Sequence, residues 1–319
     1  MTAALMLEDQ GPEFAHVPVL LREVLSFLAP RSGGLYVDAT AGGAGHSASL
    51  LRACPDARLI AFDRDPLAVR VATERLAEFG DRARVVHSSF DRMEEELAAL
   101  GVGQVDGVLA DLGVSSAQLD DRERGMSFRA SGPLDMRMDP TQGETALELI
   151  QRLDQDDLAN VIYELGDERR SRRVARCIKQ ALESGELNDT LDLRRAVVRA
   201  VGPRRVGGVD PATRTFQALR MAVNGELDQL TALLDQAQRV LAPSGVLCII
   251  SFHSLEDRAV KREFQKRERW ERLSGKPVQA GAEEVSTNPR ARSAKLRAAR
   301  LKPSDVEPQA PESEEEESA

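Results

Sequence analysis

Three aspartates stand where short apolar runs end, and these positions suit the binding of a ligand. Asp38 lies at the end of the first run, Asp63 follows the second and Asp111 follows the fourth. In open sheets of parallel strands, ligands bind at the carboxyl ends of the strands. If these runs are strands of one such sheet, the three carboxylates share one edge and favour a positively charged ligand.

A glycine-rich turn follows the first run, in the segment Asp38-Ala-Thr-Ala-Gly-Gly-Ala-Gly-His-Ser47. Glycine has no side chain, so a ligand can approach the backbone closely there. The N–H groups at the start of the next helix would also face that ligand. The stretch Gly43-Ala-Gly45-His-Ser-Ala48 fits the loose dinucleotide pattern G-x-G-x-x-A. Alone, this pattern fits a structural turn as well as a nucleotide cofactor.

Asp63 narrows the choice, since it lies eighteen residues after Gly45. A carboxylate in that place can accept hydrogen bonds from both hydroxyls of a ribose. The alternative is that Asp63 caps the helix that Pro66 opens. Three acids offer nothing to the pyrophosphate of a nicotinamide cofactor, whereas S-adenosylmethionine carries a sulfonium and an amino group. Electrostatics therefore favours S-adenosylmethionine, with an NAD-dependent oxidoreductase as the alternative.

Alternating strand and helix patterns would position these residues. Apolar runs predict strands over 35–39, 58–62, 84–87 and 105–110, with helical periodicity over 44–53, 66–79 and 91–100. This alternation predicts an α/β fold with a parallel, Rossmann-like sheet and right-handed crossovers. It stops at residue 113, where a loop to 143 and helical patterns over 144–205 indicate a helical insertion.

The remainder of the chain would complete the sheet. Apolar residues recur at helical spacing from Thr213 to Leu241 and predict one long helix. A fully buried fifth strand is expected over 245–252. A helix over 254–270 follows, with Ser254 as its N-cap. Residues 271–287 are predicted to form a flexible linker.

The net charge of −9 conceals local basic surface. The last seventeen residues contain seven acids and no base, and without them the net charge is −2. Basic residues gather instead in three clusters, over 169–176, 194–205 and 290–300. Phosphates respond to such local charge. The alternative is that each cluster is a solvated helix face paired with acids.

Cysteine usage and hydropathy indicate a reducing, cytoplasmic setting. The three cysteines are far apart and form no C-x-x-C, so neither a disulfide framework nor a zinc site is expected. No apolar run approaches the roughly 20 residues that cross a bilayer. The first fifteen residues lack the pattern of a secretory signal. We therefore expect no membrane association and no metal.

Long motifs give the chain a specific resemblance, from about His16 to Arg300. It resembles the ribosomal RNA small subunit methyltransferase H family. The motifs are His16-Val-Pro-Val-Leu-Leu, Asp38-Ala-Thr with Gly45-His-Ser, Asp63-Arg-Asp-Pro66, Asp111-Leu-Gly-Val-Ser-Ser-Ala-Gln118, Asp120-Asp-Arg-Glu-Arg-Gly125, Gly132-Pro-Leu-Asp-Met-Arg-Met-Asp139, Pro211-Ala-Thr-Arg-Thr-Phe-Gln-Ala-Leu-Arg220, Ser251-Phe-His-Ser-Leu-Glu-Asp-Arg258 and Asn288-Pro-Arg-Ala-Arg-Ser-Ala-Lys-Leu-Arg297.

The resemblance implies an enzyme that methylates N4 of a cytidine in the decoding region of 16S rRNA, with S-adenosylmethionine as methyl donor. It implies a class I methyltransferase sheet, formed by residues 16–118 and 212–300, that is split by an all-helical insertion. Residues 119–211 would form this insertion and recognise RNA. Residues 1–15 would be a flexible leader and 301–319 an acidic, disordered tail. The partner would be 16S rRNA within the small ribosomal subunit, and a homodimer is an alternative to a monomer.

Carried over by motif, the resemblance also implies the site residues. The cofactor contacts would be Ala44, Gly45, His46, Asp63, Phe90, Asp111 and Gln118. We assign catalysis to Asp111, Asn224 and His253, and substrate binding to Arg137, Arg214 and Ser251.

Each of these roles has a plainer alternative. Asp111 could serve cofactor binding alone, Phe90 could be ordinary core, and the arginines could brace the insertion. Two departures from the family pattern are visible: Ala44 replaces a frequent glycine and Ala117 a frequent proline. We expect a slightly altered loop at Ala44 with binding retained, and a looser turn at Ala117. A non-catalytic ribosome assembly factor that merely holds the cofactor is a further alternative to the enzyme.

Overall fold

The computed structural model describes residues 18–203 and 209–303, so the expected leader and nearly all of the acidic tail lie outside the described residues. Its centre is a seven-stranded sheet of order β3-β2-β1-β4-β5-β7-β6. The first five strands are mutually parallel, and β7 runs antiparallel to both β5 and β6. The strands are β1 Leu35–Asp38, β2 Arg58–Asp63, β3 Ala83–His87, β4 Val105–Asp111, β5 Leu241–Ser251, β6 Trp270–Arg272 and β7 Lys295–Leu301. The predicted α/β, Rossmann-like sheet is confirmed.

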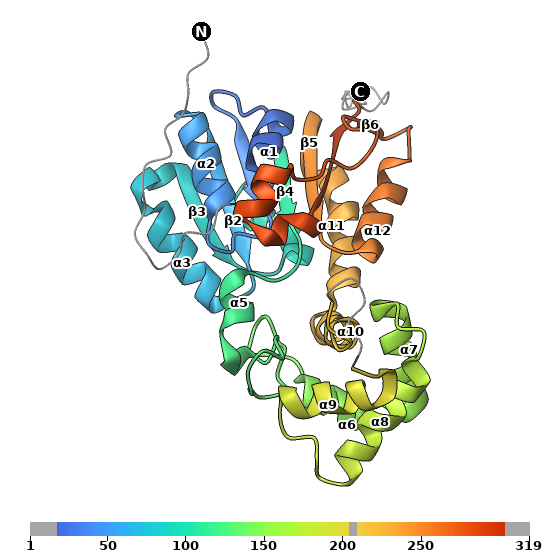
Figure 1. Ribbon diagram of the computed structural model, residues 1–319. Coiled ribbons are helices and arrows are strands. Elements are labelled where there is room, and N and C mark those ends of the chain that lie inside the picture. The colour runs from blue at the N-terminus through green and yellow to red at the C-terminus, as the bar shows by residue number, and fades with distance from the viewer. Residues whose placement is uncertain (1–17, 204–208, 304–319) are drawn as a thin grey trace, which may run out of the picture.

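Helices cover both faces of this sheet, which explains why its central strands are apolar throughout. Along β5, Cys248 and Ile250 face one core cluster, while Leu247 and Ile249 face the other. The first cluster is closed by α1 Leu21–Leu28, α2 Gly45–Ala53 and α3 Pro66–Leu76. The second is closed by α4 Met93–Ala99, α11 Glu226–Val240 and α12 Ser254–Phe264. Figure 1 shows the sheet between these layers.

A separate helical lobe lies below the carboxyl edge of the sheet in Figure 1. It consists of α6 Ala146–Arg152, α7 Gln155–Gly166, α8 Ser171–Glu183 and α9 Thr190–Val201, together with α10 Thr213–Asn224. Side chains from all five helices share a third core cluster, which includes Ile162, Ile178 and Phe216. The expected helical character of 144–205 is confirmed over its described part. The chain reaches this lobe through α5 Ser116–Asp120 and the loops that follow it.

Several helix boundaries predicted between residues 213 and 270 are wrong. The long helix expected over 213–241 is two helices, α10 and α11, because Gly225 between them adopts a φ of 60°. Apolar spacing continues across this break, which concealed it. The helix expected over 254–270 ends at Phe264, and His253 rather than Ser254 is its N-cap residue.

The prediction of a flexible linker over 271–287 is also wrong. It contains part of β6 and the helix α13 Ala282–Thr287, and Val278 pairs with Leu296 of β7. Glu284 Oε1 accepts a hydrogen bond from the Leu20 backbone N–H over 2.7 Å. These contacts order the segment against the sheet. No helix in the described part of the chain is both long and apolar enough to span a bilayer.

Candidate cofactor and active site

The turn after β1 is held by buried carboxylates. Asp38 is 2 % exposed and accepts hydrogen bonds from Ser47 Oγ over 2.6 Å and from the Thr40 N–H over 3.1 Å. The Gly42 N–H donates to Asp63 Oδ2 over 2.8 Å. Ala44 is the N-cap residue of α2 and has a φ of 55°. This is the altered position noted in the sequence, and it keeps the left-handed backbone that glycine adopts more easily.

Asp63 lies at the end of β2 and faces the same turn. Burial raises the pKa of its carboxyl to about 6, and the nearby carboxylates of Asp65 and Asp38 act in the same direction. Asp65, not Asp63, caps α3, because its Oδ1 accepts from the Leu67 N–H over 3.0 Å. The capping role considered for Asp63 therefore belongs to its neighbour. This leaves Asp63 available for a ligand at the turn.

Asp111 is the last residue of β4, which pairs with β1. Its backbone N–H donates to Thr40 Oγ1 over 2.7 Å, which fixes the strand end beside the turn. Its Oδ1 is buried and has no hydrogen-bond partner among the described residues. Burial, followed by repulsion from Asp38 and Glu256, raises the pKa of the Asp111 carboxyl to about 8.

His46 does not neutralise these acids. Its Nε2 lies 2.9 Å from the carbonyl oxygen of Val19, and this contact assigns the ring proton to Nε2. Its Nδ1 faces Asp111 Oδ2 at 3.8 Å. Burial lowers the pKa of His46, which keeps the ring neutral. Three buried or partly buried carboxyls thus share a strand edge at which no lysine or arginine forms an ion pair with them in the described structure. Such a site favours a cationic ligand.

A second polar group follows β5, next to Asp111. His253 Nε2 lies 2.9 Å from Glu256 Oε1, and Glu256 Oε2 accepts from the Phe252 N–H over 2.9 Å. Ser251 is 2 % exposed, with its hydroxyl 3.4 Å from the Lys295 carbonyl oxygen. The register aligns Asp111 with Ile250, so this group and the acidic edge are neighbours.

Two buried acids and an arginine behind His253 were missed by the sequence reasoning. Ligand atoms of Glu226, His253 and Glu256 lie within 4.8 Å of one another, a spacing compatible with a metal ion. Arg220, however, donates to both carboxylate oxygens of Glu226, over 2.8 and 2.9 Å. The guanidinium already supplies the compensating positive charge. No sequence pattern flags these residues, because buried and solvated charges look alike in a sequence.

Two predicted site residues lie where the sheet meets the helical lobe. Gln118 Nε2 donates to Asp65 Oδ2 over 2.8 Å, while its Oε1 completes a capping box with Ser115. Asn224 Oδ1 accepts from the Met138 N–H over 2.7 Å, and its Nδ2 donates to the Met136 carbonyl over 2.8 Å. Both amides are therefore occupied by structural hydrogen bonds. Their direct roles in the cofactor site and in catalysis stay predictions.

The two predicted substrate arginines also have protein partners. Arg137 pairs with Asp135 over 2.7 Å, and Arg214 Nη1 donates to the Asp167 carbonyl over 3.1 Å. Phe90 is partly buried and packs against the second core cluster. The structure thus brings together the turn, His46, Asp63 and Asp111 at one edge, with Ser251 and His253 beside them. Arg137 and Arg214 belong to the lobe below.

The sheet order, the antiparallel β7 beside β5 and the acidic carboxyl edge define a class I S-adenosylmethionine-dependent methyltransferase. The match to known proteins identifies the family. The chain belongs to the MraW methylase family, whose family model covers residues 13–302.

Three curated relatives share the name "Ribosomal RNA small subunit methyltransferase H". The protein of Sorangium cellulosum (strain So ce56) is 68 % identical over 283 residues, which cover 89 % of this chain and 90 % of the relative. That of Synechococcus sp. (strain CC9605) is 53 % identical, over 90 % of this chain and 97 % of the relative. That of Anaeromyxobacter sp. (strain K) is 48 % identical, with the same two shares. The chain is therefore similar to these proteins over nearly their full length.

Proposed function

We propose that the protein transfers a methyl group from S-adenosylmethionine to N4 of a cytidine in the decoding region of 16S rRNA, within the small ribosomal subunit. The observation that carries this proposal is the buried Oδ1 of Asp111, which lies at an acidic strand edge and has no hydrogen-bond partner among residues 18–203 and 209–303. Family membership and the names of the relatives support small-subunit rRNA as substrate. The reaction would take place in the cytoplasm, where ribosomal subunits are found.

The residues at the edge fit this cofactor. A Cβ placed on Gly43 would meet nothing within 4 Å, so the turn leaves room for a ligand beside its backbone. Asp63 would accept hydrogen bonds from a ribose, and Ala44, Gly45, His46, Phe90 and Gln118 are the further contacts that we propose. When bound, the cofactor supplies a methyl group activated by a sulfonium. The acids that favour this cation disfavour the pyrophosphate of NAD.

Asp111 would act on the amine that receives the methyl group. The lone pair of a cytosine N4 amine is delocalised into the ring, which makes it a poor nucleophile. A carboxylate that accepts a hydrogen bond from the N–H localises this pair and stabilises the positive charge that develops on nitrogen. The base must leave its stack to reach this edge. The protein then has to hold the amine about 3–3.5 Å from the methyl carbon.

Residues around Asp111 would shape the pocket for the base. Ser251 and His253 lie at the end of the neighbouring strand, where Glu256 Oε1 approaches His253 Nε2 to 2.9 Å. Asn224 would act through the 136–138 loop that its amide holds. We propose that the helical lobe, with Arg137 and Arg214, contacts the rRNA around the target. A homodimer stays a prediction.

A transfer assay tests this proposal. Purified protein is incubated with tritium-labelled S-adenosylmethionine and small subunits from a strain that lacks the enzyme, and the rRNA is digested to nucleosides. We expect the label in N4-methylcytidine at one position. Label in another nucleoside would contradict the assigned target. Cofactor binding without any transfer would instead favour the non-catalytic assembly factor.

A further inference from the structure

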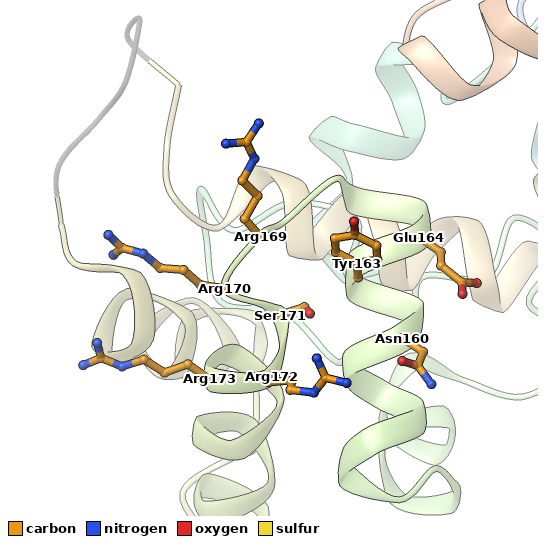
Figure 2. Close-up of a pocket in the computed structure, with 8 residues that line it drawn as sticks. All are labelled: Asn160, Tyr163, Glu164, Arg169, Arg170, Ser171, Arg172 and Arg173. Carbon is orange, nitrogen blue, oxygen red and sulfur yellow. The ribbon is translucent and has the colours of Figure 1, made fainter.

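A basic groove lies on the helical lobe. One cavity of about 700 Å³ runs between α7 and the start of α8, and Figure 2 shows the side chains that line it. A second cavity, of about 600 Å³, is lined by Tyr163, Asp167, Arg169 and Arg214. The two cavities share Tyr163 and Arg169. We call this combined surface the arginine–tyrosine groove.

Most of the arginines of the groove are free to bind a ligand. Arg169, Arg172 and Arg173 are exposed, and none forms a hydrogen bond or ion pair through its side chain with a described residue. Arg170 differs, because its Nη1 donates to the Val201 carbonyl over 2.9 Å and ties α8 to the end of α9. These three solvated guanidiniums lie within five residues of the chain. They form a concentrated site for anions.

Tyr163 adds an aromatic face to this charge. Its side chain is 58 % exposed, although most large apolar side chains of the described structure are buried. Figure 2 shows it projecting from α7 between Arg169 and Asn160. An exposed ring beside cationic groups is the arrangement that binds single-stranded nucleic acid, since bases stack on the ring while phosphates meet the cations.

The groove is joined to the active-site edge. Asp167 lines its second cavity and lies in the turn between α7 and α8. Its Oδ2 accepts a hydrogen bond from Ser254 Oγ over 3.1 Å, and Ser254 directly follows His253. One end of the groove therefore lies beside the strand end where the target base would lie.

We infer that the arginine–tyrosine groove binds a single-stranded segment of the rRNA substrate near the target cytidine, with one unpaired base stacked on Tyr163 and phosphates on Arg169, Arg172 and Arg173. This inference rests on the proposed function for the identity of the RNA. A duplex fits less well, because stacking on Tyr163 requires the free face of a base. An acidic protein segment fits less well, because it could meet the arginines but has no bases to stack on the exposed ring of Tyr163.

Binding of a fluorescein-labelled oligouridine of twelve nucleotides to the full-length protein tests the groove. We expect Tyr163→Ala to weaken binding about tenfold, whereas Tyr163→Phe retains it within about twofold, because stacking needs the ring and not the hydroxyl. Single alanine substitutions at Arg169, Arg172 or Arg173 should each reduce the slope of log Kd against log salt by about 0.7.

Arg70→Ala is the matched control. Arg70 is an exposed arginine on α3 without a described partner, so this variant loses the same charge far from the groove in sequence. All variants should keep the wild-type melting temperature and affinity for S-adenosylmethionine. In the transfer assay, the groove variants should raise KM for small subunits and leave kcat unchanged.

The inference would be overturned by no oligouridine binding by the wild type, by groove variants that bind no more weakly than Arg70→Ala, or by equal losses for a twelve-base-pair duplex. Competition by an acidic peptide that removes the effect of Tyr163→Ala would point to a protein ligand and also overturn it. A different result would refute the proposed function. If the wild type binds oligouridine through the groove but transfers no methyl group, the methyltransferase assignment is wrong, whereas the inference that the groove binds single-stranded RNA is retained.

Discussion

Asp65→Ala should disconnect the sheet from the helical lobe. Asp65 is 1 % exposed and accepts hydrogen bonds from Arg124 over 2.9 Å and from Gln118 over 2.8 Å. The same guanidinium donates to the carbonyls of Arg137 and Met138 at the entry to the lobe. One buried carboxylate therefore ties α3 and α5 to the loop that α10 also holds.

The expected loss follows from these contacts. Removal of one partner from a buried ion pair destabilises a protein by about 3–5 kcal/mol, because the other charge stays buried without compensation. Arg124 keeps two carbonyl acceptors, which places the effect at the lower end. The substitution also removes the N-cap of α3, worth about 1 kcal/mol. We expect Asp65→Ala to lower the free energy of unfolding by about 4 kcal/mol.

Asp154→Ala is the matched control for this variant. Asp154 caps α7 through the Asp157 N–H over 2.8 Å, but it is exposed and forms no ion pair with a described residue. Its loss should lower the free energy of unfolding by about 1 kcal/mol in urea titrations followed by circular dichroism. A double-mutant cycle with Arg124→Ala should give a coupling of at least about 1.5 kcal/mol. Equal losses for the two aspartates, or additivity with Arg124→Ala, would refute the reasoning.

Three further predictions concern the site and the lobe. Asp111→Asn should lower kcat at saturating cofactor by about 100-fold or more, measured by single-turnover transfer; full turnover would leave Asp111 a binding role only. The rate of transfer at limiting substrate should rise with pH and level off above about pH 8, as the pKa of Asp111 requires, and a flat profile would exclude it as the acceptor. Gly166→Ala should lower the free energy of unfolding by about 1–3 kcal/mol, measured in thermal melts, since the Cβ of the new alanine would lie 2.6 Å from the Arg214 carbonyl oxygen. An unchanged melting curve would show that α7 and α10 can separate freely.

The sheet and its acidic edge were predictable because their signals are local. Each of the first four strands is a short apolar run bounded by turn residues, and the end of each parallel strand fixes the place of Asp38, Asp63 and Asp111. The fifth strand was predicted from the same kind of signal, because residues 245–252 form an apolar run. The three aspartates share one edge of the sheet because parallel strands bring their carboxyl ends to the same edge.

The elements that were missed depend on contacts between distant segments. β7 carries Lys295, Arg297 and Arg300 among its apolar residues, and only its pairing with β5 makes it a strand. The break at Gly225 leaves the apolar spacing of the two helices intact, so periodicity alone could not reveal it. A weak local signal existed, because a glycine inside a helical pattern can mark a helix end.

The same contrast between local sequence signals and contacts made only in the fold applies to the site residues. The role of Asp65 as helix cap and ion-pair partner was hidden by its neighbour Asp63, since both precede Pro66 by a few residues. Burial of Glu226 and Glu256 beside Arg220 depends on how α10 and α11, which follow each other directly, pack against α12, which begins at Ser254. The sequence does show the arginines at 169–173, but not that Arg170 bonds to Val201 while the other three have no side-chain partner in the described part of the chain.

Calorimetry of S-adenosylmethionine binding at pH 7, in buffers of different ionisation enthalpy, tests most directly whether the acidic edge holds a cationic methyl donor. With a pKa of about 8, the Asp111 carboxyl is about nine-tenths protonated at this pH before binding, and a bound cation lowers that pKa. The wild type should therefore release close to one proton more than Asp111→Asn, and its affinity should rise between pH 6 and pH 8. Absence of binding, or the same proton count for both proteins, would contradict the account.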